Sequence, residues 1–310
     1  MENLIIGIDL GGTNLRIGAV SEANKVYHQR VIGSGRLSEV ENASDELGKI
    51  IEDYIAKHCI SGICAISIGV PSSVAADKET VICTTNIRNQ RDEPVFYHTN
   101  LAKSLRQRFQ LPVFINNDTN NILRYDVHQY HLEAQSVIAG IYIGTGVGAS
   151  VLIDGRSYTG ADGAALDLGH IPYYQETDTC SCGKRGCCEC YASGWRLQKI
   201  RQQYYPQTDI HELFLKHKEE QPMKEFLYSC SHVFSIMATI FNPSTIVLGG
   251  GVIEMPDFPK KLFEQLVNEN TGKDVMAYGF DYVYSKAYPG KGVIGAALFA
   301  RKMLRATETC

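Results

Sequence analysis

Cysteines mark the part of this 310-residue chain with the clearest chemistry, because five of the ten lie within residues 180–190. Their C-x-C-G-x-x-G-C spacing makes a tight loop, as a structural zinc knuckle needs, and a histidine lies ahead of it. One imidazole and three thiolates form a closed tetrahedral zinc set. We therefore predict a structural zinc site with the ligands His170, Cys180, Cys182 and Cys187. Cys188 or Cys190 could replace Cys187, and free thiols are the alternative to any metal.

A carboxylate and two amides follow the short strand expected near residues 111–115, in the order Asn116, Asn117, Asp118. Phosphoryl transfer needs a positioned carboxylate that accepts the proton of an attacking hydroxyl, and Asp118 could serve as that general base. Asn117 could bind sugar hydroxyls as both donor and acceptor. A helix follows directly, so the alternative is that Asp118 is only the N-cap of that helix.

Glycine-rich segments end three strand-like runs, at residues 9–14, 144–148 and 249–251. Glycine lets backbone N–H groups approach a phosphate and adopt positive φ. None of the three matches the P-loop or Rossmann pattern, and a hairpin tip lacks the helix that both need. Asp9, which ends the first strand, could be a carboxylate that holds Mg²⁺ through water, or only a hydrogen-bond acceptor.

The elements that must position these residues alternate between strands and helices. Residues 4–20 and 137–153 each read as an apolar run, a glycine turn and a second apolar run, which predicts two hairpins. The repetition favours two related half-molecules over two unrelated hairpins. Further elements are expected as helices near 40–57, 99–109, 223–241 and 293–304, and as strands at 63–68, 113–115 and 245–248. This alternation is typical of a layered α/β fold.

The length of the chain corresponds to about two domains of roughly 150 residues. We expect the halves to join near residues 118–135, and the last helix to pack back on the first half. The expected domains are therefore 1–118 with 291–310, a small α/β domain, and 119–290, a larger one that carries the zinc loop.

Composition narrows the class of protein. Hydrophobic residues make up 44% of the chain and charged residues 21%, as in ordinary globular proteins. The net charge of -4 and the lack of a long basic run argue against nucleic acid as a partner. No apolar run is long enough to cross a membrane, and the first residues lack a signal-peptide pattern. We expect a cytoplasmic protein with reduced thiols.

In order along the chain, these motifs resemble those of the ROK family, named for repressors, open reading frames and kinases. The matching segments are DLGGTN at 9–14, NNDTN at 116–120, GTGVG at 144–148, DLGH at 167–170, the cluster at 180–189, and FNP through the third glycine run at 241–251. The resemblance covers essentially the whole chain. It implies the actin-like (ribonuclease H-like) ATPase fold, with two domains around a cleft for ATP and sugar.

The resemblance also implies an activity and a role for each matching residue. The activity is ATP- and Mg²⁺-dependent phosphorylation of an aldohexose at its 6-hydroxyl, with Asp118 as the catalytic base. The implied sugar ligands are Asn86, Asn117, Asp167, His170 and Glu189. The implied nucleotide contacts are Asp9, Gly11, Gly12, Thr13, Asn14, Gly144, Thr145 and Gly146 at the phosphates, with Gly249 and Gly250 on the adenosine side. His170 would bind zinc through one ring nitrogen and a sugar hydroxyl through the other. We also expect a homodimer.

Four departures from the family pattern line the expected sugar pocket. Asp167 replaces a Glu, Leu166 a Gly and Ser72 a Gly, and Asn86 is followed by Ile87 with no Trp nearby. The shorter Asp167 retracts an acceptor from the sugar, and the Ser72 hydroxyl could meet the sugar instead. With similarity in the runs 80–86, 168–172 and 251–256 to members that act on D-allose, these changes favour D-allose over glucose, N-acetylmannosamine and fructose.

Two rival functions differ from a kinase in class. A sugar-responsive repressor of the same family would need a helix-turn-helix ahead of the first hairpin, and Asp9 lies too near Met1 for one. A non-catalytic sugar sensor would not need a base, so the presence of Asp118 argues against it.

Overall fold

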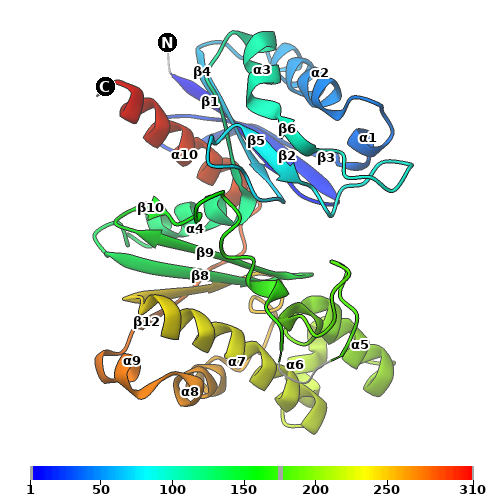
Figure 1. The fold of residues 1–310 in the computed structure, drawn as a ribbon, viewed down its shortest axis with the longest axis vertical. Helices are drawn as coiled ribbons and strands as arrows, with labels where there is room; N and C mark the ends of the chain where they lie inside the picture. The colour runs from blue at the N-terminus through cyan, green and yellow to red at the C-terminus, as the bar shows by residue number, and fades with distance from the viewer. Residues whose placement is uncertain (1–2, 174–176, 309–310) are drawn as a thin grey trace. The chain divides into compact units, whose positions relative to one another are not determined.

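The computed structural model describes residues 3–173 and 177–308. They form two compact units, each built on one five-stranded sheet (Figure 1). Unit 1 comprises Met1–His131, Thr159–Ala165 and Tyr288–Cys310, and unit 2 comprises Leu132–Tyr158 and Leu166–Ala287. No helix within these described ranges is both long and apolar enough to span a membrane.

The sheet of unit 1 has the strand order β3-β2-β1-β4-β7. The first three strands are antiparallel neighbours, whereas β4 and β7 run parallel to β1. The bounds are β1 Leu4–Leu10, β2 Asn14–Val20, β3 Val26–Gly33, β4 Ile63–Val70 and β7 Val113–Asn117. A separate two-stranded ribbon pairs β5 Thr80–Cys83 with β6 Tyr97–Asn100. The carboxyl ends of parallel strands lie at the same end of a sheet. Asp9 of β1 and the residues after β7 therefore lie at the same end of this sheet.

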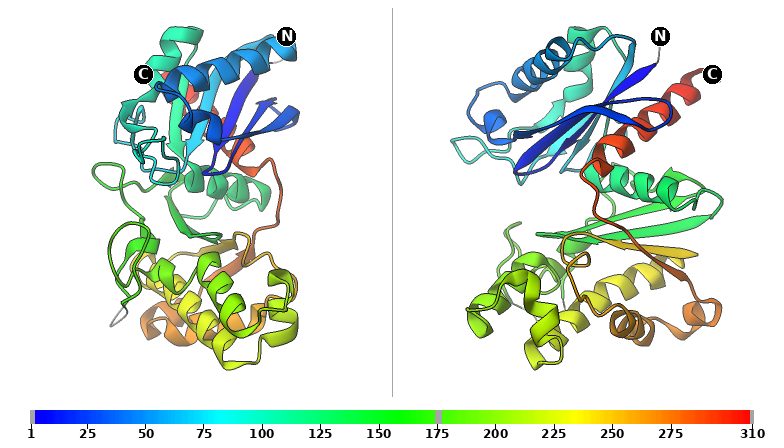
Figure 2. Two further views of the ribbon diagram at one scale, coloured as in Figure 1. Left: turned by 90° about the vertical axis from the view of Figure 1, so that its right-hand side faces the viewer. Right: turned by 180° about the vertical axis from the view of Figure 1, so that it is seen from behind.

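Helices cover both faces of this sheet (Figure 2). On one face α2 and α3 pack on Ile6 and Ile8, and on the other α10 packs on Ile5 and Ala65. Because successive strand residues point to opposite faces, β1 is apolar throughout. The helices are α1 Gly35–Ser38, α2 Ala43–Lys57, α3 Leu101–Phe109, α4 Asp118–Gln129 and α10 Lys291–Glu308, with α4 packed against α10.

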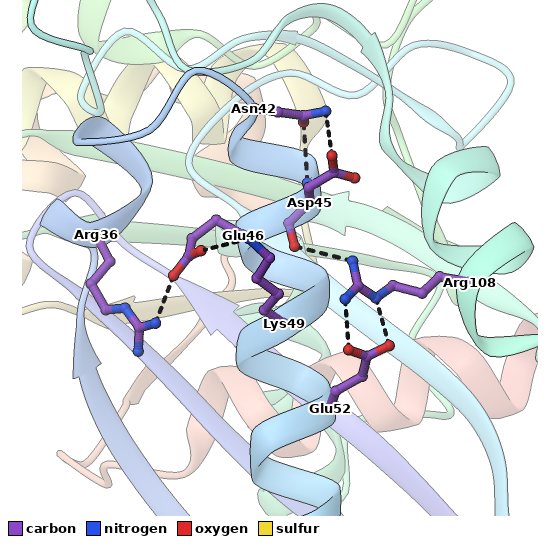
Figure 3. Close-up of polar contacts among 7 residues, drawn as sticks. All are labelled: Arg36, Asn42, Asp45, Glu46, Lys49, Glu52 and Arg108. Atoms are coloured by element: carbon purple, nitrogen blue, oxygen red, sulfur yellow. Dashed lines mark hydrogen bonds and ion pairs between the residues drawn. The ribbon is translucent and has the colours of Figure 1, made fainter.

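Polar contacts fix the start and the exposed side of α2 (Figure 3). Asn42 caps the helix by accepting from the N–H of Asp45 at 3.1 Å, as short polar side chains commonly do. Arg36 contacts Glu46 at 2.6 Å, and Arg108 of α3 binds both carboxylate oxygens of Glu52 at 2.6 Å each. The Arg108–Glu52 pair is largely exposed and contributes little stability, so its main effect is to orient α3 relative to α2.

The sheet of unit 2 has the order β10-β9-β8-β11-β12. Its strands are β8 Val137–Ile143, β9 Val147–Ile153, β10 Arg156–Ser157, β11 Thr245–Gly249 and β12 Asp281–Tyr284. The hairpin β8–β9 is antiparallel, and β11 runs parallel to both β8 and β12. Its helices are α5 Gly194–Tyr204, α6 Leu213–His217, α7 Gln221–Phe241, α8 Lys260–Asn270 and α9 Lys273–Tyr278. The long α7 and α8 pack on one face of the sheet (Figure 1).

The two predicted hairpins are confirmed as β1–β2 and β8–β9. In both sheets an outer strand joins the hairpin on one side and two parallel strands join it on the other, so the echo in the sequence extends to the strand order. The sequence placed a domain boundary after residue 118, whereas in the structure the first crossing falls after His131. The reason is that α4 stays with unit 1 by packing along α10.

Candidate functional site

Asp118 is the first residue of α4, directly after β7. The helix is capped by Asn117, whose Oδ1 accepts from the N–H of Asn120 at 3.2 Å. The alternative that Asp118 is only the N-cap is therefore wrong. The Oδ1 of Asp118 accepts from the N–H and the hydroxyl of Thr119 at 2.7 and 3.3 Å. The cap and the adjacent hydrogen bonds hold the carboxylate at a fixed position on unit 1.

The electrostatic surroundings of Asp118 suit a base that works near neutral pH. Burial, together with the nearby charge of Asp9, raises the pKa of Asp118 to about 7. A general base is most effective when its pKa lies near the working pH. Asp118 keeps a partly exposed surface, so the carboxylate can still be reached.

Asp9 lies near the end of β1, with 16% of its side chain exposed. Burial raises the pKa of Asp9, and Arg16, which is its partner across the hairpin at 3.5 Å, opposes that rise. Gly292, in the first turn of α10, lies against the same carboxylate, and a Cβ placed there would be 2.3 Å from Asp9 Cγ. The hairpin register could have predicted Arg16, whereas no sequence signal links residue 292 to residue 9.

Replacing Gly292 by Ala is expected to displace the Asp9 carboxylate while keeping the helix, because Ala favours helix over Gly by about 1 kcal/mol. If Asp9 serves Mg²⁺ as the sequence predicts, the KM for Mg·ATP rises roughly tenfold, the equivalent of about 1.4 kcal/mol. Steady-state kinetics and a thermal melt measure both effects. Gly35→Ala is the control, because no atom lies within 4 Å of a Cβ there. An unchanged KM would separate Asp9 from the phosphates.

The first glycine tip, between β1 and β2, is closed by backbone and serine contacts. Gly11 donates to the Asn14 oxygen at 2.8 Å, and Ser34 contacts the Gly11 and Thr13 oxygens at 2.7 and 2.9 Å. Gly12 and Thr13 are exposed at the tip. The backbone oxygen of Asn86 lies 3.3 Å from the Cβ position of Gly12, so the structure brings Asn86 next to this tip. Ser34, which orders the tip, was not predicted.

Ser72 lies beside Asn117, and its hydroxyl makes hydrogen bonds within the protein. The Asn117 amide donates to the Ser72 backbone oxygen at 3.2 Å. Ser72 is 7% exposed as a residue, and its hydroxyl donates to the Ser73 oxygen at 3.0 Å and accepts from the Cys83 N–H at 3.0 Å. This hydroxyl uses its only proton to hold the turn together, so it could meet a sugar only as an acceptor, and its contact with the sugar stays a prediction.

In unit 2, the predicted metal ligands converge. The ligand atoms of His170, Cys180, Cys182 and Cys187 all lie within 4.8 Å of one another. Cys180 Sγ is 3.5 Å from His170 Nδ1, and the sulfurs of Cys182 and Cys187 are 3.7 Å apart. A tetrahedral ion with Zn–S near ~2.3 Å and Zn–N near ~2.0 Å separates its ligands by roughly 3.5–3.8 Å. The donor set therefore fits zinc in both chemistry and spacing.

The neighbouring cysteines differ from the four ligands in their surroundings. Cys188 belongs to the apolar core that α5 and α7 line. Cys190 packs beside Cys180 and Cys187, and its sulfur lies 3.8 Å from the Asp178 oxygen. Neither belongs to the four-residue group that the described part of the chain brings together. The geometry therefore favours Cys187 over both.

With Nδ1 directed at the cysteines, the Nε2 atom of His170 faces the opposite way. Asp167 lies on that side, with its Oδ1 3.9 Å from Nε2, which is too long for a hydrogen bond. The Asp167 side chain is 68% exposed. Two polar groups of the predicted sugar set thus lie together at the edge of the metal loop, and among residues 3–173 and 177–308 neither His170 Nε2 nor the Asp167 carboxylate has a hydrogen-bond partner.

The second glycine tip, between β8 and β9, contacts two other segments of unit 2. Gly144 donates to the Gly146 oxygen at 3.0 Å, which closes the turn. Gly194 and Trp195, at the start of α5, donate to the oxygens of Gly144 and Thr145 at 2.8 and 3.2 Å. Glu189 accepts from the N–H that follows the tip, that of Val147, at 3.0 Å. The contacts from α5 were not predicted.

The third glycine segment ends β11. A Cβ at Gly249 would lie 2.7 Å from the Tyr142 ring, and Gly250 has φ 91° with the Ile143 oxygen 2.5 Å from its Cβ position. Close packing on β8 therefore accounts for both glycines. Their role beside adenosine stays a prediction.

The predicted site residues fall into two sets, one in each unit. In unit 1 are Asp9, Gly11, Gly12, Thr13, Asn14, Asn86, Asn117 and Asp118. In unit 2 are Gly144, Thr145, Gly146, Asp167, His170, Cys180, Cys182, Cys187, Glu189, Gly249 and Gly250. The first set offers a base with a near-neutral pKa and an exposed glycine tip, and the second offers a metal centre, polar groups beside it and a second tip.

Known proteins share this organisation. The ROK family model matches residues 5–303. The N-acetyl-D-glucosamine kinase of Pectobacterium carotovorum is 26% identical over 263 residues, covering 79% of this chain and 83% of the relative. The glucokinase of Thermotoga maritima is 26% identical over 321 residues, covering 97% and 98%. A crystal structure of a ROK family glucokinase from Streptomyces griseus with glucose and AMPPNP has a TM-score of 0.77 at 22% identity, covering 97% of this chain and 100% of that one. This likeness confirms the actin-like fold expected from the sequence.

Proposed function

Starting from a chain that belongs to the ROK family and is a sugar kinase within it, we propose that it transfers the γ-phosphoryl group of ATP to the 6-hydroxyl of an aldohexose, with D-allose favoured. The observation that carries the proposal is Asp118, held at the head of α4 with a pKa of about 7. Sugar-dependent release of ADP tests it directly. A non-catalytic sugar sensor or a repressor would release no ADP on addition of any hexose.

In this reaction Asp118 accepts the proton as the sugar oxygen bonds to the γ-phosphorus and the bond to the ADP oxygen breaks. Mg²⁺, when bound with ATP, neutralises charge on the phosphates. Asp9 is the proposed carboxylate on the metal side, and the tips at Gly11–Asn14 and Gly144–Gly146 are the proposed phosphate contacts. Gly249 and Gly250 are proposed to lie on the adenosine side. The backbone N–H groups of the tips at Gly11–Asn14 and Gly144–Gly146 suit phosphate oxygens, because glycine lets the chain come close to a phosphate.

The metal loop is proposed to hold one structural zinc through His170, Cys180, Cys182 and Cys187. A zinc ion with four protein ligands has no open position, so it orients side chains and does not take part in the transfer. His170 would present Nε2 to the sugar, beside Asp167. Asn86, Asn117 and Glu189 complete the proposed sugar set. Zinc-bound thiolates and the use of ATP support a cytoplasmic location, and the expected homodimer stays a prediction.

The choice of sugar rests on Asp167, because the Ser72 hydroxyl is already used within the protein. Asp is one methylene shorter than the Glu of the family pattern, so a sugar hydroxyl bonded at full Glu reach would lack its acceptor. An unpaired polar group of this kind costs roughly 1–3 kcal/mol. A hydroxyl of different stereochemistry can avoid that cost, and this supports an epimer of glucose, with D-allose first.

We expect wild type to prefer D-allose to glucose, and Asp167→Glu to shift the ratio of kcat/KM values toward glucose by roughly tenfold, about 1.4 kcal/mol. A coupled ADP assay over D-allose, glucose, mannose, fructose and their N-acetylamino relatives measures the ratio. Asp274→Glu makes the same chemical change at an exposed position of α9 and serves as the control. A wide preference for glucose in wild type would overturn the allose proposal and leave the kinase proposal standing.

A further inference from the structure

The carboxylate of Glu189 is enclosed by backbone from two other segments of unit 2. Its Oε2 accepts from the Val147 N–H at 3.0 Å. The same oxygen lies 2.2 Å from where a Cβ on Gly146 would be, and 3.3 Å from the corresponding position on Gly169. A side chain at 146 would displace the carboxylate from this position, and one at 169 would crowd it. Glu189 thus fills a space between the second glycine tip and the turn that carries His170.

Metal ligands adjoin both Glu189 and Gly169 in the sequence. Gly169 directly precedes His170, and Glu189 follows Cys187 by two residues. Backbone contacts join the two segments, because the Cys188 N–H donates to the Ile171 oxygen at 2.8 Å and Pro172 pairs with Cys187 as an isolated bridge. An ion that holds His170 and Cys187 together therefore also fixes where Glu189 can reach.

On the other side of the carboxylate is the tip proposed to hold phosphate. The turn at Gly144–Gly146 has one internal hydrogen bond, and Val147 begins β9 directly after it. A hydrogen bond from a backbone N–H to a carboxylate is stronger than one between neutral groups. Glu189 is therefore a fixed anchor for the C-terminal end of the tip.

From these contacts we infer that Glu189 links the metal loop to the second glycine tip, so that the tip takes its phosphate-binding conformation only when the metal loop is intact. The inference rests on the proposed function, which makes the tip a phosphate contact. It gives Glu189 a positioning role toward the nucleotide in addition to the proposed contact with the sugar. An intact metal loop would then be needed for nucleotide affinity as well as for sugar affinity.

The test measures the Kd of Mg·AMPPNP without sugar, by calorimetry and by the fluorescence of Trp195. Trp195 is the only tryptophan of the chain, and its backbone N–H donates to the backbone oxygen of Thr145 in the tip at 3.2 Å. Glu189→Ala is expected to raise the Kd roughly five- to tenfold, because the Val147 N–H loses a charged partner. Glu189→Gln keeps an acceptor oxygen and is expected to restore most of the affinity. Removing the metal from wild type with a chelator should weaken AMPPNP binding to a similar degree.

A double-mutant cycle isolates the contact. Gly146→Ala places a Cβ against the Glu189 carboxylate, and the three nearest atoms to that Cβ all belong to Glu189. The substitution should weaken AMPPNP binding by itself and have no further effect in the Glu189→Ala background. Asp167→Asn is the matched control, because it removes a carboxylate from the same sugar set. It should weaken sugar binding and leave the AMPPNP affinity unchanged.

The link would be overturned if Glu189→Ala and Gly146→Ala bound AMPPNP as tightly as wild type. It would also be overturned if Gly146→Ala changed the AMPPNP affinity equally in the wild-type and Glu189→Ala backgrounds. Zinc content and thermal melts of each variant confirm that the fold and the metal are retained. Failure of the proposed function looks different from failure of the link. AMPPNP would then bind wild type, and the cycle would show coupling, but no hexose would stimulate release of ADP.

Discussion

Asp118→Asn is expected to give a folded protein that binds Mg·ATP and has lost about 10²–10⁴-fold in kcat, the usual cost of removing a general base. The amide has nearly the same shape, and its oxygen can still accept from the Thr119 N–H as the carboxylate does at 2.7 Å. It cannot accept the proton of the sugar hydroxyl. Coupled ADP release and AMPPNP titration separate the two properties, with Asp53→Asn at an exposed position of α2 as the control. Near-normal turnover in purified Asp118→Asn would show that another group is the base.

The pKa of Asp118 makes the same variant informative about pH. A base must be ionised, so with a pKa of about 7 wild-type kcat/KM should fall about tenfold per pH unit below that value. The residual activity of Asp118→Asn should lack this fall. The assignment of Asp118 as the base would be contradicted if the kcat/KM of wild type stayed constant from roughly pH 5.5 to roughly pH 7.

The stability of the variant should move in the opposite direction to its activity. The carboxyl has an ordinary pKa of 3.8 when unfolded and about 7 when folded, so the unfolded chain ionises first as pH rises. The folded state is therefore destabilised progressively above pH 3.8, and fully above pH 7. Asn carries no such cost, which is at most about 4 kcal/mol and smaller for a partly exposed group. The Tm of Asp118→Asn minus that of wild type should grow between about pH 4 and about pH 7, the window between the unfolded and folded pKa values. A constant difference would show that Asp118 is not strained by its charge.

The second large effect is expected at the metal loop. Cys182→Ser should remove about one zinc per chain, because a closed site needs all four ligands. We expect sugar affinity to fall on the order of 10–100-fold, since His170 loses the ion that orients its ring. The Tm should also fall, because metal binding contributes to folding. Metal analysis, sugar titration and a thermal melt measure the three effects on chelator-free protein.

Neighbouring thiols supply the controls for this prediction. Cys190→Ser changes a buried cysteine that packs beside the cluster but lies outside the four-residue group. It should keep zinc and most of the sugar affinity, as should Cys59→Ser at an exposed position of unit 1. Loss of zinc in Cys190→Ser with retention in Cys182→Ser would reassign the ligand. Wild-type protein without zinc would contradict the metal proposal altogether.

Features that depend on neighbours in the sequence were predictable. Glycine between two apolar runs was enough to predict β1–β2 and β8–β9, because a hairpin is a local structure. The cysteine spacing predicted the cluster for the same reason, since Cys180, Cys182 and Cys187 belong to one short loop. The start of α4 was predicted, and the cap was considered at Asp118 only as the alternative to the base, whereas the structure places it at Asn117. Two polar residues in a row suit a cap equally well, and only the backbone geometry selects one.

Features that depend on distant contacts were not predictable. Gly292 lies against Asp9, nearly the whole chain away, and nothing in either segment indicates the other. The use of the Ser72 hydroxyl depends on the N–H of Cys83, which β5 brings into place. The contact of Glu189 with Val147 depends on three segments that meet only in the folded unit. A motif indicates which residues a site contains, whereas the hydrogen-bond capacity left for a ligand depends on the tertiary contacts.

The membership of α10 in unit 1 has a consequence for synthesis on the ribosome. One face of β1 and β4 is covered by α10, through Val293, Ile294 and Ala297. The ribosome makes these residues only after all of unit 2, so that face stays uncovered while residues 132–287 emerge. Unit 2 can complete its own apolar core first, although its sequence comes second. We therefore expect a nascent chain of this protein to finish unit 2 before unit 1, and to need protection of the bare sheet face from aggregation in the interval.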